Sequence, residues 1–284
     1  MAWYKLIEFD HDTDIKKTGK TTIYKYRNWD QDKHSTILKE LQLWAAHPKS
    51  FEDNYDIRCQ YVFNKEEVFD DSYFDNVYFS AIEDYPNCRN YKTPIFFDFC
   101  KYRWAKIKKD PIEHFSKKII ELREGKNYDE IGVLSLTFAE PDKYSMWQKY
   151  ANDGAGFCVG FDRKKLGVCL NRLLFFQGKI QYSNEKPLFS FKDFTMTEFL
   201  IKTLEWANEE EFRFVKYAIP CDEQRAFKFT EDCIEEIVLG YSISPENQEE
   251  ILQILRNKFK SRIPLYKMVK IPDSKSLEKI PIIY

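Results

Sequence analysis

The chain has 284 residues, of which 43% are hydrophobic and 17% aromatic, and its formal net charge is −2. This length is ample for a sizeable core, and the whole-chain charge does not favour non-specific attraction to nucleic acid. The sequence has only nine glycines and contains neither G-x-G-x-x-G nor G-x-x-x-x-G-K-[ST], which argues against a glycine-rich phosphate loop.

The cysteines and histidines do not form the patterns of a disulfide framework or a zinc site. The seven cysteines are odd in number and include no C-x-x-C pair, and none of the four histidines has metal-site spacing to a cysteine or to another histidine. The first ten residues hold no apolar segment of signal-peptide length. No stretch approaches the roughly 20 apolar residues that span a bilayer. We therefore expect a protein of the reducing cytoplasm that is not in a membrane and has no metal site.

The first half of the chain is expected to mix strands and helices. Alternating side chains predict a strand at 22–27. Apolar residues at helical intervals predict a helix from the capping Ser35 to about residue 47, ended by Pro48. A strand is expected at 57–63, two helices at 95–109 and 111–124, a strand at 131–138, a helix at 145–152 and a strand at 157–161.

The second half alternates more clearly. Strands are expected at 175–182, 226–229, 234–240 and 263–271, and helices at 194–207 and 245–259. The elements do not follow a regular β-α order, and no repeat or composition break divides the chain. This pattern predicts one α+β domain over 1–284, with a mixed, mostly antiparallel sheet and a helical insertion at 95–125.

The most informative segment runs from Trp206 to Arg213. If it ends a helix and enters a strand, Glu209, Glu211 and Arg213 share one face, because side chains alternate along a strand. Two carboxylates beside a guanidinium can form a tuned acid or base. They can equally form an ion-paired strand face without a function. Both interpretations stay open at this point.

Four stretches together resemble the bacterial family called domain of unknown function 2971, in that family's order. They are 24–27 with 37–40 and 43–51; 134–137 with 146–151 and 156–162; Lys202, Trp206, Glu209, Glu211 and Arg213; and 236–240. The chain departs from the family at 51–56, where two aspartates remain but an asparagine and a proline are missing. The resemblance implies a prokaryotic accessory protein associated with phage defence and abortive infection.

A more distant resemblance is to ADP-ribosyltransferases, which carry an early arginine, a Ser-x-Ser-like strand and a Glu-x-Glu strand. Here these are Arg27, then 135–137, then 209–211. The resemblance implies that Arg27 holds NAD, that Ser135 and Thr137 brace the ribose, and that Glu211, helped by Glu209, stabilises the charged sugar. The residues expected to bind NAD are Tyr26, Arg27, Ser135, Thr137, Trp147, Tyr150 and Arg213, with the aromatic rings placed to stack on nicotinamide.

Each of these residues also has an ordinary structural interpretation. Arg27 can form a salt bridge with Asp53 or Asp56 that fastens the first strand. The hydroxyls of 135–137 can satisfy neighbouring strand groups, and the aromatic residues of 147–150 can pack in the core.

Three functional hypotheses follow. The leading one is an NAD-using ADP-ribosyltransferase-like enzyme, or an NAD glycohydrolase, acting on an unidentified macromolecular or small-molecule acceptor in anti-phage defence. The second is a non-catalytic sensor that binds a phage or host protein through the acidic, aromatic segment 66–87. The third is a metal-dependent nuclease that uses Asp53, Asp56, Glu209 and Glu211. The basic, aromatic run at 101–109 leaves nucleic-acid binding open.

Overall fold

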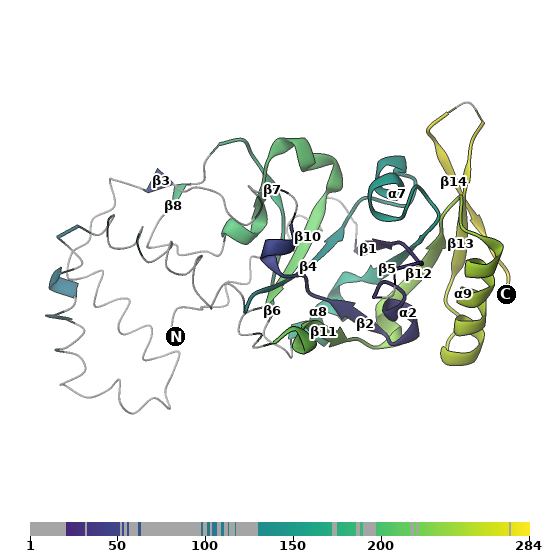
Figure 1. Cartoon of the computed structure of the whole chain (residues 1–284), viewed down its shortest axis with the longest axis horizontal. Coiled ribbons are helices and arrows are strands. Elements are labelled where there is room, and N and C mark those ends of the chain that lie inside the picture. The colour runs from purple at the N-terminus through teal and green to yellow at the C-terminus, as the bar shows by residue number, and fades with distance from the viewer. Residues whose placement is uncertain are drawn as a thin grey trace. The chain divides into compact units, whose positions relative to one another are not determined.

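The computed structural model describes residues 21–31, 33–51, 53, 56, 62–63, 98, 101–102, 104–106, 109–110, 113, 117, 130–171, 175–185, 188–189, 197–216, 219, 221–272 and 274–284 (Figure 1). The chain divides into two compact units. The first consists of Met1–Ile7, Arg58–Tyr128 and Glu185–Thr197, and the second of Glu8–Ile57, Asp129–Asn184 and Glu198–Tyr284.

The first unit contains the segment predicted to be a helical insertion. Its described strands are β3 (Val62–Phe63) and β8 (Leu188–Phe189), which pair in parallel. Residues 98, 101–102, 104–106, 113 and 117 are helical, in agreement with the helices expected at 95–109 and 111–124. The rest of the strand expected at 57–63, and the segment 66–87 of the sensor hypothesis, lie outside the described residues.

The second unit is built on an eight-stranded sheet with the order β14-β13-β12-β5-β1-β4-β10-β6. Every pair in it is antiparallel except β12 with β13. The fold is therefore α+β with a mixed, mostly antiparallel sheet, as the sequence predicted. The strands are β1 (Thr22–Arg27), β4 (Gly132–Thr137), β5 (Phe157–Asp162), β6 (Phe175–Lys179), β10 (Glu211–Lys216), β12 (Ile234–Leu239), β13 (Leu265–Lys270) and β14 (Leu277–Pro281).

Helices and short strands complete this unit. The α-helices are α2 (Thr36–Lys39), α7 (Tyr144–Tyr150), α8 (Arg163–Asn171) and α9 (Pro245–Lys258). The 3₁₀ turns are η1 (Pro48–Ser50), η3 (Thr197–Leu200), η4 (Leu204–Glu209), η5 (Asp222–Arg225) and η6 (Glu231–Cys233). Two more pairs of strands are β2 (Gln42–Trp44) with β11 (Ala226–Lys228), and β7 (Gln181–Tyr182) with β9 (Ile201–Lys202).

The large sheet has an apolar core on each face. Along β1, Ile23 faces one core and Tyr24 and Tyr26 face the other, because successive side chains alternate. Helices α8 and α9 contribute to the first core, and α7 contributes Met146 and Trp147 to the second. The longest of these helices, α9, begins at the capping Ser244, whose hydroxyl accepts a hydrogen bond from Asn247 N at 3.1 Å.

Three sequence predictions were wrong in detail. The helix expected at 35–47 ends at Lys39, and a positive φ of 50° at Leu41 turns the chain into β2. The apolar residues whose spacing predicted one helix therefore lie first on a short helix and then on a strand. Instead of the helix expected at 194–207, the described residues form η3, β9 and η4. The strand expected at 175–182 is interrupted between β6 and β7, and helix α8 and strand β14 were not predicted.

The large sheet is weakly joined between β1 and β4. These strands share one register pair, Tyr24 with Thr137, although each pairs along six residues with its other neighbour. The ammonium of Lys25 donates a hydrogen bond to the carbonyl oxygen of Ser135 and so links the two strands. The sheet therefore has a split beside the segment that contains Ser135.

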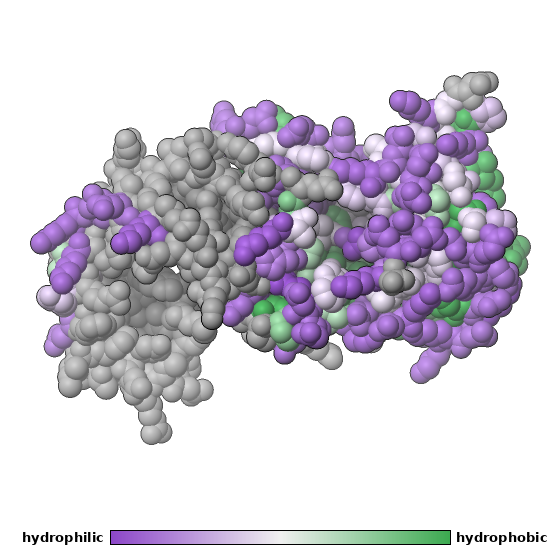
Figure 2. Space-filling view, in the orientation of Figure 1, coloured by the Kyte–Doolittle hydropathy of each residue, from purple (hydrophilic) through white to green (hydrophobic). Residues whose placement is uncertain are grey.

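On the face drawn in Figure 2, the described residues are mainly hydrophilic, with apolar side chains exposed near the C-terminal edge of the sheet. Val269, Ile271 and Ile280 are each slightly more than 40% exposed, and Ile283 is 90% exposed. None of the described helices has the length and apolar character needed to cross a lipid bilayer.

Candidate functional site

The candidate site begins where β4 and β10 pair. Glu211 lies opposite Thr137, and Arg213 lies opposite Ser135. Directly opposed residues of an antiparallel pair have side chains on the same face. Phe212 and Phe214 alternate to the other face and are buried in the core there. The sequence therefore predicted correctly that Glu211 and Arg213 share one face and the phenylalanines the other.

Glu209 does not belong to this strand, which corrects the prediction that it shares the strand face. It is the last residue of η4, and Glu210 between the two acids has a left-handed backbone with φ 44° and ψ 45°. Thr137 fixes the turn, because its hydroxyl donates to the carbonyl oxygen of Glu209 and accepts from Ala139 N at 2.7 Å. The carboxylate of Glu209 still lies beside that of Glu211, but through a turn rather than through strand alternation.

Arg213 is the centre of the site and is completely buried. Its Nη1 and Nη2 donate to Asp56 Oδ1 and Oδ2 at 2.7 and 2.6 Å. Its Nε and Nη2 donate to Glu211 Oε1 and Oε2 at 2.6 and 3.0 Å, and Nη1 also donates to the carbonyl oxygen of Phe199 at 3.0 Å. The guanidinium therefore holds two carboxylates in fork geometry. It has no accessible face for NAD, which the sequence analysis had assigned to it.

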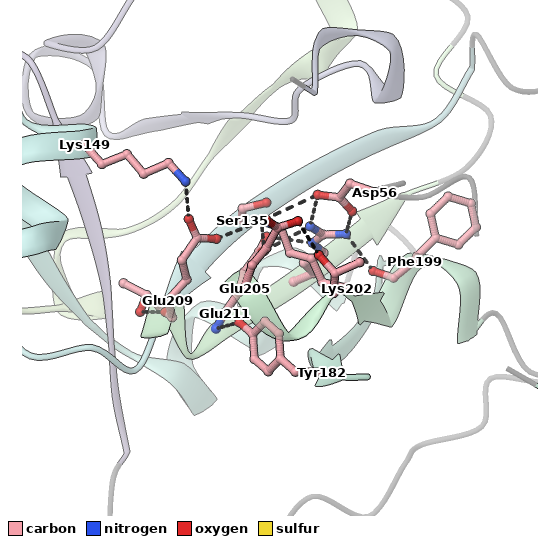
Figure 3. Close-up of polar contacts among 12 residues, drawn as sticks. Asp56, Ser135, Lys149, Tyr182, Phe199, Lys202, Glu205, Glu209 and Glu211 are labelled. Carbon is pink, nitrogen blue, oxygen red and sulfur yellow. Dashed lines mark hydrogen bonds and ion pairs between the residues drawn. The ribbon is translucent and has the colours of Figure 1, made fainter. Parts of the chain in front are cut away.

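Lys202 joins the three carboxylates of Asp56, Glu209 and Glu211, which we call the acidic cluster. Its ammonium lies 2.7 Å from Glu209 Oε2, 3.4 Å from Glu211 Oε2 and 3.7 Å from Asp56 Oδ2 (Figure 3). It also lies 4.6 Å from the ring centroid of Trp206. The lysine is buried, so its charge is compensated by the carboxylates rather than by water.

Glu209 is the member of the cluster with a route to solvent. Its Oε1 accepts from Lys149 Nζ at 2.7 Å and from the hydroxyl of Tyr150, both on α7. The Lys149 side chain is 38% exposed and lies over the Trp206 ring at 3.5 Å. The Glu209 carboxylate is thus reached by moving one exposed lysine, whereas Glu211 is enclosed by Arg213.

The surrounding cations keep the carboxylates ionised. Burial alone would raise the pKa of Glu211, but Arg213, Lys202 and the nearby Ser135 hydroxyl hold it at about 2. Burial also opposes ionisation of Glu209, and Lys202 with Lys149 and Tyr150 lowers its pKa. The Ser135 hydroxyl is itself buried and has no other close partner among the described residues.

The acidic cluster in turn shifts the pKa values of its cationic partners, Lys202 and Arg213. Burial would lower the pKa of Lys202 and of Arg213, but the acidic cluster raises both, so each stays protonated. Burial raises the pKa of Tyr150, and the neighbouring Glu209 raises it further, so this hydroxyl remains a donor. The hydroxyl of Tyr182 accepts a hydrogen bond from Glu211 N at 2.8 Å.

Arg27 is the last residue of β1, and its side chain forms no hydrogen bond or ion pair with any described residue. The expected salt bridge to Asp56 is not formed, because Asp56 pairs with Arg213 and Lys202. Arg27 alternates with Tyr26 and therefore projects from the face opposite Glu211. Burial lowers its pKa to about 10. Burial lowers the pKa of Lys25, the positive charge of Arg27 lowers it further, and the opposing effect of Glu211 is smaller.

Tyr26 and Trp147 belong to the core rather than to an open pocket. The Tyr26 hydroxyl donates to the carbonyl oxygens of Ala139 and Glu140 at 3.1 and 2.9 Å. Trp147 is completely buried and donates from Nε1 to the carbonyl oxygen of Pro141 at 2.7 Å. The two rings meet edge to face with centroids 5.2 Å apart. They are therefore engaged with each other and not placed to stack on a nicotinamide ring.

The acidic cluster is not arranged as a metal site. Within the described residues, no group of three or more His, Cys, Asp or Glu side chains is placed to hold a metal ion. The oxygens of Asp56, Glu209 and Glu211 face lysine and arginine nitrogens instead, at distances of 2.6–3.7 Å. Each carboxylate already has a cationic partner from the protein.

Sequence reasoning gave some members of the site no role and gave Asp56 a different one. Lys202 and Trp206 stood in the stretch that carried the family resemblance, next to the glutamates, but received no role. Asp56 was considered a partner of Arg27 or a metal ligand. Lys25 gave no signal, because its contact with Ser135 depends on the split between β1 and β4.

The comparisons with known proteins agree with the family resemblance in part. Residues 146–214, which run from α7 to β10, match the model of a family described as Protein of unknown function (DUF2971). This range contains two of the three members of the acidic cluster, Glu209 and Glu211. It also contains the cluster's partners Lys149 and Tyr150 on α7, Lys202 on β9 and Arg213 on β10. Neither the curated proteins nor the solved structures provide a match to this chain.

Proposed function

We propose that this chain is an ADP-ribosyltransferase-like enzyme that cleaves NAD and acts as an effector of bacterial anti-phage defence. One observation carries the proposal. Strands β1, β4 and β10 are neighbours in the sheet, and they carry Arg27, the hydroxyls of Ser135 and Thr137, and Glu211, with Glu209 in the turn before β10. These are the three elements on which the resemblance to ADP-ribosyltransferases depends, and folding brings them together from distant parts of the sequence.

The reaction needs a carboxylate that stays ionised beside a sugar. When the bond between ribose C1′ and the nicotinamide nitrogen breaks, its electron pair leaves with nicotinamide and positive charge develops on the ribose. A hydroxyl of the acceptor, or water, then bonds to C1′ and releases its proton to solvent. We assign the stabilising role to Glu209, because both oxygens of Glu211 are held by Arg213. Glu211 is then a positioning residue that acts through Lys202.

The other residues support this arrangement in different ways. Thr137 holds the backbone of Glu209, and Tyr150 donates to its carboxylate. The Ser135 hydroxyl is buried next to Glu211 and has a free hydrogen-bonding capacity for a ribose hydroxyl. Arg27, to which the resemblance assigns the dinucleotide, projects from the sheet face opposite Glu211, so we give it no contact with NAD at this site.

The direct test is to incubate the purified chain with NAD and measure nicotinamide release. We expect Glu209→Gln to lower the rate by about 100-fold or more, the size typical of losing a preorganised electrostatic stabiliser. The amide oxygen can still accept from Lys149 and Tyr150, and Lys202 keeps the carboxylates of Glu211 and Asp56, so we expect the variant to remain folded, which its melting temperature checks. The matched control is Glu210→Gln, which changes an adjacent carboxylate that pairs with Lys143 and lies 31% exposed. Equal rates in the two variants would exclude Glu209 from the reaction.

The defence role has its own test. Bacteria that express the chain should plate phage less efficiently, and Glu209→Gln should abolish that protection while Glu210→Gln retains it. If both variants protect as well as the native chain, the protein defends by binding rather than by catalysis. That outcome would replace the enzyme with the non-catalytic sensor.

A further inference from the structure

We propose that Cys169 and Cys233 are an oxidation site at which hydroperoxides produce a reversible disulfide. Their Sγ atoms lie 3.5 Å apart, although the residues are 64 positions apart in the sequence. Cys169 is in α8 and Cys233 ends η6, just before β12. Cysteine spacing does not predict this pair, because the cysteines have no C-x-x-C spacing and are odd in number.

The geometry requires only a small closure. A disulfide bond is about 2.05 Å long, so the two sulfurs must approach by roughly 1.5 Å. The hydroxyl of Thr230 lies beside the two sulfurs, 3.4 Å from the sulfur of Cys169 and 3.6 Å from that of Cys233. No atom of Thr230 has to leave the space between the sulfurs, and side-chain rotation can supply the remaining movement.

The two thiols differ in accessibility, which sets the order of the steps. Cys169 is partly exposed and Cys233 is buried. Burial raises the pKa of the Cys233 thiol to about 11, which keeps it protonated and slow to react with an oxidant. Cys169 is thus the sulfur that meets the hydroperoxide, and Cys233 is the sulfur that resolves the product.

The chemistry balances with one hydroperoxide. The thiolate of Cys169 attacks the terminal oxygen, the O–O bond breaks, and a sulfenic acid forms as water or an alcohol leaves. The sulfur of Cys233 then attacks the sulfur of Cys169, the S–O bond breaks, and the leaving hydroxide takes the Cys233 proton as water. Two thiols and one peroxide become one disulfide, and a dithiol reductant reverses the change.

The test uses the full chain treated with hydrogen peroxide, after which free thiols are blocked and peptides are analysed by mass spectrometry. We expect a cross-linked peptide that joins Cys169 to Cys233, lacks two hydrogen atoms and disappears with dithiothreitol. Oxidation should also raise the melting temperature, because the new bond closes a long loop of the unfolded chain.

Variants assign each step. Cys233→Ser should accumulate the sulfenic acid of Cys169, which dimedone traps, and Cys169→Ser should give no cross-link to residue 233. Cys221→Ser is the matched control, since Cys221 is free and exposed and its loss should leave the cross-link unchanged. Absence of the 169–233 peptide in the native chain, or preferential pairing of either cysteine with another one, would overturn the proposal. The readouts are independent of NAD cleavage.

Discussion

Arg213 and Asp56 are 157 residues apart and are joined by two parallel hydrogen bonds of 2.7 and 2.6 Å. The arginine is on strand β10, next to the edge strand β6, and the aspartate lies in a turn that follows η1. Both side chains are almost wholly inaccessible to solvent. A turn distant in the sequence is therefore fastened to the sheet by a buried ion pair, and this pair also determines where Glu211 lies.

Removing this arginine should destabilise the second unit strongly. Arg213→Met leaves the carboxylates of Asp56 and Glu211 buried with only Lys202 as a cation. The expected loss is about 3–5 kcal/mol in the free energy of unfolding, the range for breaking a buried pair from one side. Urea denaturation measures it. Arg256→Met is the control, because its pair with Glu249 is about half exposed and should contribute only about 0–1 kcal/mol. A similarly small decrease in the free energy of unfolding for both variants would show that the buried pair of Arg213 does not stabilise the fold.

Acid should weaken the protein through Glu211. Its pKa is lowered to about 2 in the folded chain from an ordinary 4.5, so the folded state favours the ionised form. The resulting stabilisation is complete above about pH 4.5 and is lost as the pH falls through 4.5 toward 2. Two and a half units correspond to roughly 3 kcal/mol.

This loss is measured by urea unfolding at a series of pH values between 2 and 7. Glu211→Gln is the comparison, because an amide does not titrate in this range. The variant should be less stable at neutral pH and its stability should decline less steeply as the solution is acidified. Parallel curves for the native chain and the variant would show that Glu211 is not the group responsible.

We expect the Thr137 hydroxyl to affect catalysis indirectly, because it positions the backbone of Glu209. Thr137→Val preserves the side-chain shape but removes the hydroxyl that serves Glu209 O and Ala139 N, leaving two buried backbone groups unpaired. We expect a loss of about 1–3 kcal/mol in stability. If Glu209 acts on NAD, kcat should fall with little change in KM, and Thr137→Ser should restore it. A variant with a changed KM and an unchanged kcat would place Thr137 at the binding step instead.

Two glycines should respond to alanine in opposite directions. Gly154 has a φ of +78°, and a Cβ there would lie 2.4 Å from the ring of Tyr241, so Gly154→Ala should cost about 1–3 kcal/mol. Gly167 lies in helix α8, and a Cβ there would meet only the flexible end of Gln177 at 3.3 Å. Gly167→Ala should therefore be neutral or stabilising by up to about 1 kcal/mol. Thermal unfolding of the two variants compares them directly, and a Gly154→Ala protein as stable as the native chain would contradict the turn geometry.

The sequence predicted the sheet well where its pattern was local. Alternation identified β1, β4, β5, β12 and β13 to within two or three residues at each end, and the helical spacing of Ile251, Leu252 and Leu255 identified α9. It failed where the same apolar spacing suits two structures. Ile37, Leu38, Leu41 and Trp44 fit one continuous helix, but Trp44 lies on β2, which pairs with β11 far along the sequence.

The sequence predicted several residues of the candidate site but not the contacts between residues that are distant in the sequence. Glu209, Glu211 and Arg213 are close in the sequence, so their proximity could be inferred. The partner of Arg213 could not, because Asp56 is brought to it by tertiary folding and not by any periodicity. The same reason hid the contact of Lys25 with Ser135 and the approach of Cys169 to Cys233.

The left-handed backbone of Glu210 restricts which sequences can build this site. A β-branched residue is disfavoured strongly at φ 44°, while glycine, asparagine and aspartate adopt it readily. Only with that turn do residues 209 and 211 direct their carboxylates to the same lysine, at 2.7 and 3.4 Å. Relatives that carry valine or isoleucine between the two glutamates would have to give up one of these contacts. The middle residue of the Glu-x-Glu motif is therefore a diagnostic position for recognising proteins that share this arrangement.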